Sequence, residues 1–177
     1  MSSHPKERCV MLEIGTIVVY GVEGVCKISG VEKLCFAGLD TAKDYYVLEH
    51  IDNSNGKFYV PVDNELLMAK MQKLFTYEEV MELIKADLSL PEWIDDNKQR
   101  SKFYKEELSS YDNTRIFALA KMLYLAKGDK EKRFYVMDEE ALKKVSSALY
   151  SQLSCVASLT REELLPFICG EIVCAKK

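Results

Sequence analysis

The N-terminal third of the chain contains short runs of mainly β-branched and aromatic residues whose side chains would alternate at the two-residue period of β-strands. Residues 17–20 and 25–28 carry this pattern, and Gly21 and Gly24 bracket the short segment between them. Glycine suits such a segment because it accepts backbone conformations that other residues avoid. We therefore predict an antiparallel hairpin at the start of a small barrel.

Two further runs of aromatic and β-branched residues follow, at residues 44–49 and 57–62. The segment that joins them ends in Asn55-Gly56, a pair that favours a tight hairpin turn. Runs of this composition are typical of strands. Together with the first hairpin they predict four or five short strands.

From Thr76 onward the apolar residues recur every three or four positions, which is the spacing of helices. Residues 64–71 are expected to form a short helix or turn between the two patterns. Capping boxes, a proline and a glycine divide the second pattern into about five helices. These helices are expected to begin at Thr76 (ending near Asp87), at Pro91 (running to Leu108), after Asp112 (closing at Gly128), at Asp138 and at Thr160.

The change of pattern predicts an α+β protein with two modules. Residues 11–72 are expected to form the small β-barrel of four or five strands, and residues 73–177 a compact all-α domain. Residues 1–10 are polar and are expected to be a disordered N-terminal extension. Nearly half of the 177 residues are apolar, so each module can bury a core.

The net charge of −4 limits how this chain could bind nucleic acid. Domains that hold DNA by bulk electrostatics are usually strongly basic. Any contact with DNA must therefore be local, or assisted by a partner that holds the protein in place.

The cysteines and histidines do not form the motifs of metal or redox sites. The six cysteines include no Cys-x-x-Cys pair, and only two histidines accompany them. The chain also lacks the common nucleophile, phosphate-loop and dinucleotide motifs. We predict no catalytic residues, no metal and no cofactor, with mostly buried, reduced thiols. The lack of a secretory pattern and of a long apolar run predicts a cytoplasmic protein with no membrane partner.

One basic run stands out in the helical half. Lys98, Arg100, Lys102 and Lys105 occur within eight positions without an acidic residue, shortly after the only tryptophan, Trp93. On a helix the three lysines share one face, with the arginine farther round, so several could reach one phosphate backbone. The alternative is a solvated helix face. Trp93 has two interpretations as well, a core anchor between helices or an exposed aromatic wedge.

A second basic group falls in the expected loop after Gly128. Lys130 and Arg133 belong to it, interleaved with acidic residues. They could flank the same DNA, although loop lysines usually serve only solubility.

Four motifs follow one another in the N-terminal module: Ile14-Gly15, Val18-Val19-Tyr20-Gly21-x-x-Gly24-Val25, Tyr45-Tyr46-Val47-Leu48 and Tyr59-Val60-Pro61-Val62-Asp63. In this order they resemble the motifs of the CarD/CdnL family of bacterial transcription regulators. The resemblance covers residues 11–63 in motif and residues 73–169 in helix order. It implies a Tudor-like barrel that docks on the β subunit of RNA polymerase and a helical domain that touches promoter DNA.

The resemblance also implies site residues. By position, Lys33, Lys57 and Tyr59 match the polymerase-binding part of the family's barrel. Family members place a tryptophan before an arginine-containing basic helix and use it as a minor-groove wedge, which Trp93 and Arg100 match.

These observations predict a regulator that docks on RNA polymerase and contacts promoter DNA near the upstream edge of the bubble, modulating open-complex stability. DNA binding should be weak without polymerase. One alternative is a protein-protein adaptor that makes no direct DNA contact. A second is an enzyme of unrecognised type, which would need converging carboxylates, cysteines or His50 around a cavity.

Overall fold

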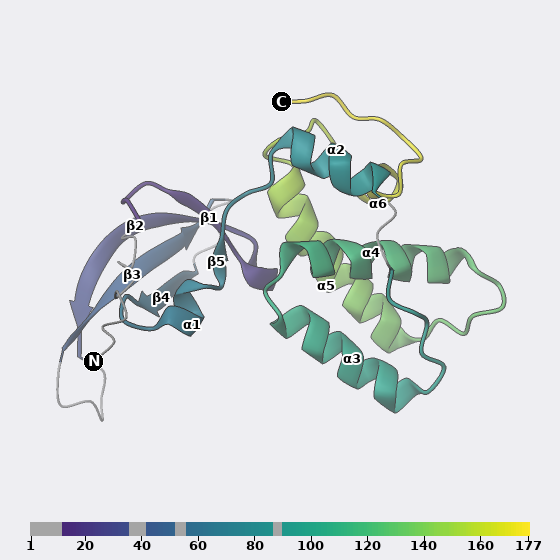
Figure 1. The fold of residues 1–177 in the computed structure, drawn as a ribbon, viewed down its shortest axis with the longest axis horizontal. Coiled ribbons are helices and arrows are strands. Elements are labelled where there is room, and N and C mark those ends of the chain that lie inside the picture. The colour runs from purple at the N-terminus through teal and green to yellow at the C-terminus, as the bar shows by residue number, and fades with distance from the viewer. Residues whose placement is uncertain (1–11, 36–41, 52–55, 87–89) are drawn as a thin grey trace, which may run out of the picture.

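The computed structural model describes residues 12–35, 42–51, 56–86 and 90–177. The expected extension at residues 1–10 and most of the segment before Gly56 lie outside the described residues. Within them, a β module precedes a helical module (Figure 1), so the α+β prediction is confirmed.

The β module is one antiparallel sheet with the strand order β4-β3-β2-β1-β5. The predicted first hairpin is present: β1 and β2 are joined by the 3-10 turn η1, where Gly21 and Gly24 have φ of +54° and +92°. A short helix, α1, lies between β4 and β5. The bounds are β1 Ile17–Tyr20, η1 Gly21–Glu23, β2 Val25–Leu34, β3 Lys43–His50, β4 Lys57–Pro61, α1 Glu65–Met68 and β5 Met71–Gln72.

One face of this sheet carries the core of the β module. Tyr46 and Leu48 of β3 are fully buried there, against Cys26 and Ile28 of β2 and Val60 of β4. Alternate residues of a strand point to opposite faces, so the remaining residues of β3 and β4 face the other side.

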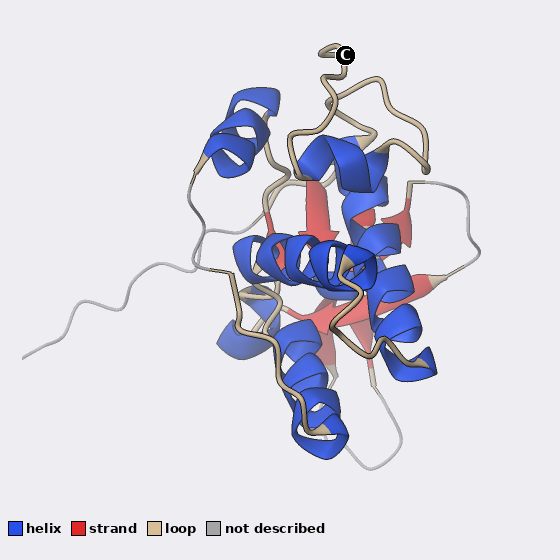
Figure 2. Ribbon diagram, turned by 90° about the vertical axis from the view of Figure 1, so that its right-hand side faces the viewer, coloured by secondary structure: helices blue, strands red, loops and turns tan. Residues whose placement is uncertain are grey.

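Five described helices follow the sheet. Their core is built around α4 and α5, whose buried apolar side chains include Phe117, Leu123 and Leu149. Viewed from the helical side, the helices lie in front of the sheet (Figure 2). The bounds are α2 Tyr77–Lys85, α3 Asn97–Ser109, α4 Asn113–Gly128, α5 Val136–Leu153 and α6 Leu164–Ile168.

Helix ends agree with the sequence patterns in some places and differ in others. The capping box at Thr76 is present, and α4 follows its Asp112 cap and closes at Gly128 as expected. However, α3 begins only at Asn97, because the Asp96 carboxylate caps it by accepting the Gln99 N–H at 2.8 Å. Pro91 therefore precedes the helix instead of opening it.

Two further helix starts also differ from expectation. Asp138 lies inside the first turn of α5, which begins at Val136. The last helix begins at Leu164, and the Glu163 carboxylate accepts the Thr160 N–H at 2.7 Å in the turn before it.

The two modules interlock at the η1 turn. Val22 of this turn packs against the helical core, and the Val25 N–H donates to Ser151 Oγ of α5 at 3.1 Å. The ring of Tyr111, itself at a φ of +56°, covers Gly21. The turn thus packs into the helical module, and Tyr111 covers it from the helical side.

Candidate functional site

The edge strand β4 presents two of the predicted polymerase contacts on one face. Lys57 lies opposite Glu49, and Tyr59 lies opposite Val47. Residues directly opposite each other point to the same face, so both side chains lie on the side of the sheet away from its core. Tyr59 is 40% exposed although Val47 beside it is buried. Among the described strands, β4 has only β3 as a hydrogen-bonded neighbour, so its other edge is available to a partner strand within the part of the chain that the structure describes.

An exposed ion pair lies beside Tyr59 on this face. Lys57 Nζ is 2.9 Å from Glu49 Oε1. The hydrogen bond and the charge of each partner raise the pKa of Lys57 and lower that of Glu49, so both groups are ionised at neutral pH. The face therefore combines an aromatic ring with a paired cation and anion.

Lys33 does not join this face. In β2, Val31 lies opposite the buried Tyr46, so it faces the core side of the sheet. Lys33 comes two residues later, opposite Asp44, and therefore faces the same side. A β-bulge between Ile28 and Gly30 inserts one extra residue and reverses the alternation beyond it. The structure thus brings Lys57 and Tyr59 together and places Lys33 on the opposite face.

The three predicted lysines of α3 lie at the surface. Lys98, Lys102 and Lys105 are all exposed. Lys102 is paired only loosely, at 3.7 Å, with Glu106 one turn on. Lys98 and Lys105 have no ion-pair partner among the described residues. Because positions 98, 102 and 105 follow helical spacing, they form one cationic stripe along α3.

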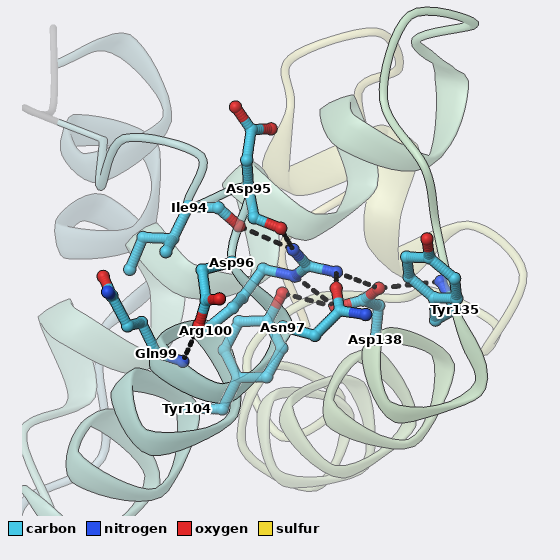
Figure 3. Close-up of polar contacts among 9 residues, drawn as sticks. All are labelled: Ile94, Asp95, Asp96, Asn97, Gln99, Arg100, Tyr104, Tyr135 and Asp138. Carbon is cyan, nitrogen blue, oxygen red and sulfur yellow. Dashed lines mark hydrogen bonds and ion pairs between the residues drawn. The ribbon is translucent and has the colours of Figure 1, made fainter.

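Arg100 differs from the sequence expectation, because its side chain is buried and not at the surface. It is 1% exposed, and its guanidinium binds the Asp138 carboxylate through Nε at 2.9 Å and Nη2 at 3.1 Å (Figure 3). It also donates to the carbonyls of Ile94 and Asp95 and to Asn97 Oδ1. With its donors used inside the protein, Arg100 holds the segment before α3 onto α5.

Asp138 is the centre of this buried network. Besides Arg100, it accepts the Tyr104 hydroxyl at 2.8 Å and the Tyr135 N–H at 2.7 Å. Burial opposes its ionisation, but hydrogen bonds from Arg100, the Tyr135 N–H and Tyr104 outweigh it, so the pKa of Asp138 is lowered. Burial, followed by the bond to this carboxylate, raises the pKa of Tyr104. The ionised Asp138 carboxylate thus accepts hydrogen bonds from Arg100, Tyr104 and the Tyr135 N–H.

Trp93 lies in the segment that Arg100 holds. Its ring stacks with Phe134 at a centroid distance of 6.3 Å, and the Arg100 guanidinium lies over it at 4.3 Å. Trp93 is half-buried and packs against the helical core. These contacts are those of an anchor between helices, and the wedge role stays a prediction.

The second basic group approaches the start of α3. Arg133 and Lys98 line one open concavity of about 640 Å³ next to Trp93. Asp95, Asp96 and Glu131 line it too, so its charge is mixed. Lys130 is exposed in the same loop. The structure therefore places part of the loop beside the first turn of the α3 stripe, without forming a strongly positive surface.

The sequence reasoning missed the role of Asp138. Its position near a helix start indicated a cap, and the pairing with Arg100 joins residues 38 positions apart. The only available signal was the spacing of Arg100 and Tyr104, which lie one turn apart on the side of α3 that faces the core.

Comparison with known proteins concerns the β module. Residues 12–74 match the family model of the CarD-like/TRCF RID domain. A search of curated proteins found no match. None of the described helices is long and apolar enough to cross a membrane. In the described ranges, no three metal-ligating side chains come together.

Proposed function

We propose that this chain, whose residues 12–74 form a CarD-like/TRCF RID domain, is a transcription regulator that docks on the β subunit of RNA polymerase and contacts promoter DNA. The domain match itself supports an RNA polymerase-binding role in transcription. The β subunit, the DNA contact and an effect on open complexes are the proposed parts.

The proposed docking surface is the open edge of β4 with the face that carries Lys57 and Tyr59. A partner strand added there would gain main-chain hydrogen bonds along the edge. Tyr59 supplies the kind of half-exposed aromatic ring that anchors many interfaces. Lys33, on the other face, is not part of this surface.

The proposed DNA contact is the stripe of Lys98, Lys102 and Lys105, with Lys130 and Arg133 at its start. Arg100 supports it from inside by holding the start of α3 in place through Asp138. Three to five lysines and arginines make a weak phosphate-binding surface on their own. Docking on polymerase would raise its effective concentration at the DNA to about the millimolar range. Contacts at the upstream edge of the bubble would then stabilise or destabilise melted DNA.

Retention on polymerase tests the docking half of the proposal. The wild-type chain should co-purify with RNA polymerase and with its isolated β-subunit lobe, and the Lys57→Ala/Tyr59→Ala variant should not. Lys33→Ala is the matched control, because it removes a cation from the opposite face and should retain binding. If the wild type is not retained, or if the double variant binds equally, the docking surface is wrong.

The adaptor alternative has one observation in its favour. Residues 73–177 contain 17 basic and 18 acidic residues, and one of the basic ones, Arg100, is buried. The two functions separate in a promoter-opening assay with polymerase. Lys98→Ala/Lys102→Ala/Lys105→Ala should abolish the effect on open-complex lifetime while polymerase retention stays unchanged. An unchanged effect would favour the adaptor.

A further inference from the structure

A cavity lies at the junction of the two modules, apart from both proposed surfaces. Its volume is about 300 Å³. One wall comes from the η1 turn and the neighbouring strand ends, with Val22, Glu23 and Ile51. The other comes from the C-terminal half of α5 and the segment after it, with Ser147, Tyr150 and Arg161.

Two opposite charges line this cavity without pairing. Glu23 and Arg161 are both exposed at its walls, and neither forms an ion pair with another described residue. The Arg161 guanidinium instead lies over the Tyr150 ring, 4.4 Å from its centroid. This contact orients the guanidinium and leaves its N–H donors available, since a cation over a ring is attracted by the ring face alone.

His50 and Cys155 line the cavity too, and its charged and apolar groups suit one class of ligand. A guanidinium binds a carboxylate with two parallel hydrogen bonds, and the carboxylate of Glu23 suits an ammonium group. Val22 and Ile51 supply apolar surface. Ser147 is exposed at the wall, and its hydroxyl makes no hydrogen bond with the described residues, so it is available to a polar group. A molecule with a carboxylate, an ammonium and a short side chain would satisfy all of these groups at once.

The volume limits the size of that molecule. At about 300 Å³ the cavity lies at the small end of the range of pockets that hold small molecules. A free amino acid such as leucine suits this size. We propose that the junction cavity binds a free α-amino acid, with its carboxylate on Arg161 and its ammonium on Glu23.

A ligand bound in the junction cavity would stabilise the arrangement of the two modules. Because the walls belong to both modules, a ligand that fills the cavity binds only the interlocked form. Such a ligand stabilises that form by RT ln(1 + [L]/Kd), so the effect grows with ligand concentration. The binding itself does not depend on polymerase docking, so the two proposals can fail separately.

The test is a titration of the full-length, ¹⁵N-labelled chain with each proteinogenic L-amino acid, followed by NMR and thermal unfolding. We expect saturable shifts at the amides of Val22, Ile51 and Ser147 and a raised melting temperature for at least one amino acid. N-acetyl-L-leucine lacks the ammonium and L-leucinamide lacks the carboxylate, so both should bind more weakly than L-leucine. The proposal would be overturned if no amino acid gave saturable shifts. It would also be overturned if both analogues bound as tightly as L-leucine.

Variants connect the binding to the two charges. Arg161→Ala and Glu23→Gln should each weaken binding of the preferred amino acid about 10- to 100-fold, the usual effect of losing a charged hydrogen bond. Both residues are exposed, so the variants should remain folded. The matched controls, Lys144→Ala and Glu140→Gln, remove exposed charges of α5 outside the cavity and should leave binding unchanged. If the controls weaken binding as much as the cavity variants, the ligand is held by general charge and the proposed site is wrong.

Discussion

Replacing Asp138 by alanine should cost this protein a large part of its stability. Asp138 is fully buried, and it accepts hydrogen bonds from Arg100, Tyr104 and the Tyr135 N–H. The variant would leave the Arg100 cation buried without its partner. Breaking a buried ion pair in this way costs about 3–5 kcal/mol. A protein of this size has a total unfolding free energy of about 5–15 kcal/mol.

Calorimetry and urea unfolding measure this loss. For 150–250 residues, each kcal/mol shifts the melting temperature by about 2–4 °C, so a loss of 4 kcal/mol lowers it by about 8–16 °C. Glu140→Ala is the control, because this residue is exposed on the same helix and should change stability by less than about 0.5 kcal/mol. The double variant Arg100→Met/Asp138→Leu removes both charges and should be more stable than Asp138→Ala alone.

The same carboxylate should make stability sensitive to acid. Its pKa in the folded chain lies below the ordinary value of 3.8. The unfolded chain therefore takes up protons first as the pH falls. The contribution of Asp138 is complete above about pH 5 and is lost progressively as the pH falls from there through the folded-state pKa. In Asp138→Ala this part of the pH dependence should disappear. A loss below about 1 kcal/mol at pH 7, or an unchanged acid profile, would refute the assignment of a buried, ionised, fully bonded pair.

Two further predictions concern the module junction and helix α2. Gly21→Ala should destabilise the chain by about 1–3 kcal/mol in thermal unfolding, because its φ is +54° and a Cβ there would overlap the Tyr111 ring. Gly30→Ala, with open space around the added Cβ, is its control, and an equal loss there would contradict the steric argument. Thr76→Ala removes the capping box of α2 and should cost about 1 kcal/mol of unfolding free energy in urea. Thr114→Ala in α4 should cost less, since the cap there is Asp112; a similar cost would count against the capping interpretation.

The local elements of this fold were predictable because their causes are local. A strand shows itself by alternation over a few residues, and the β1–β2 hairpin follows from two glycines at its turn. The capping box of α2 lies within four consecutive positions. The motifs of residues 11–63 also carried the resemblance that the domain match over residues 12–74 confirms. Where a second local signal competed, as Asp96 did with Pro91 for the start of α3, the expected boundary moved.

The candidate site depended more on long-range pairing. One extra residue at the bulge before Gly30 moved Lys33 away from the face of Lys57 and Tyr59, and alternation along a single strand cannot reveal such a change.

The sequence by itself determined the order of strands and helices and the positions of the basic residues along the chain. Only the tertiary structure decided which of these residues are free to meet a partner. Arg100 and Lys98 belong to the same basic run, yet one is buried on Asp138 and the other is exposed. Glu23 and Arg161 lie far apart in the chain, yet both line one cavity. The reason is physical: secondary structure follows from interactions within a few residues, whereas the partner of a charge is set by how the finished elements pack.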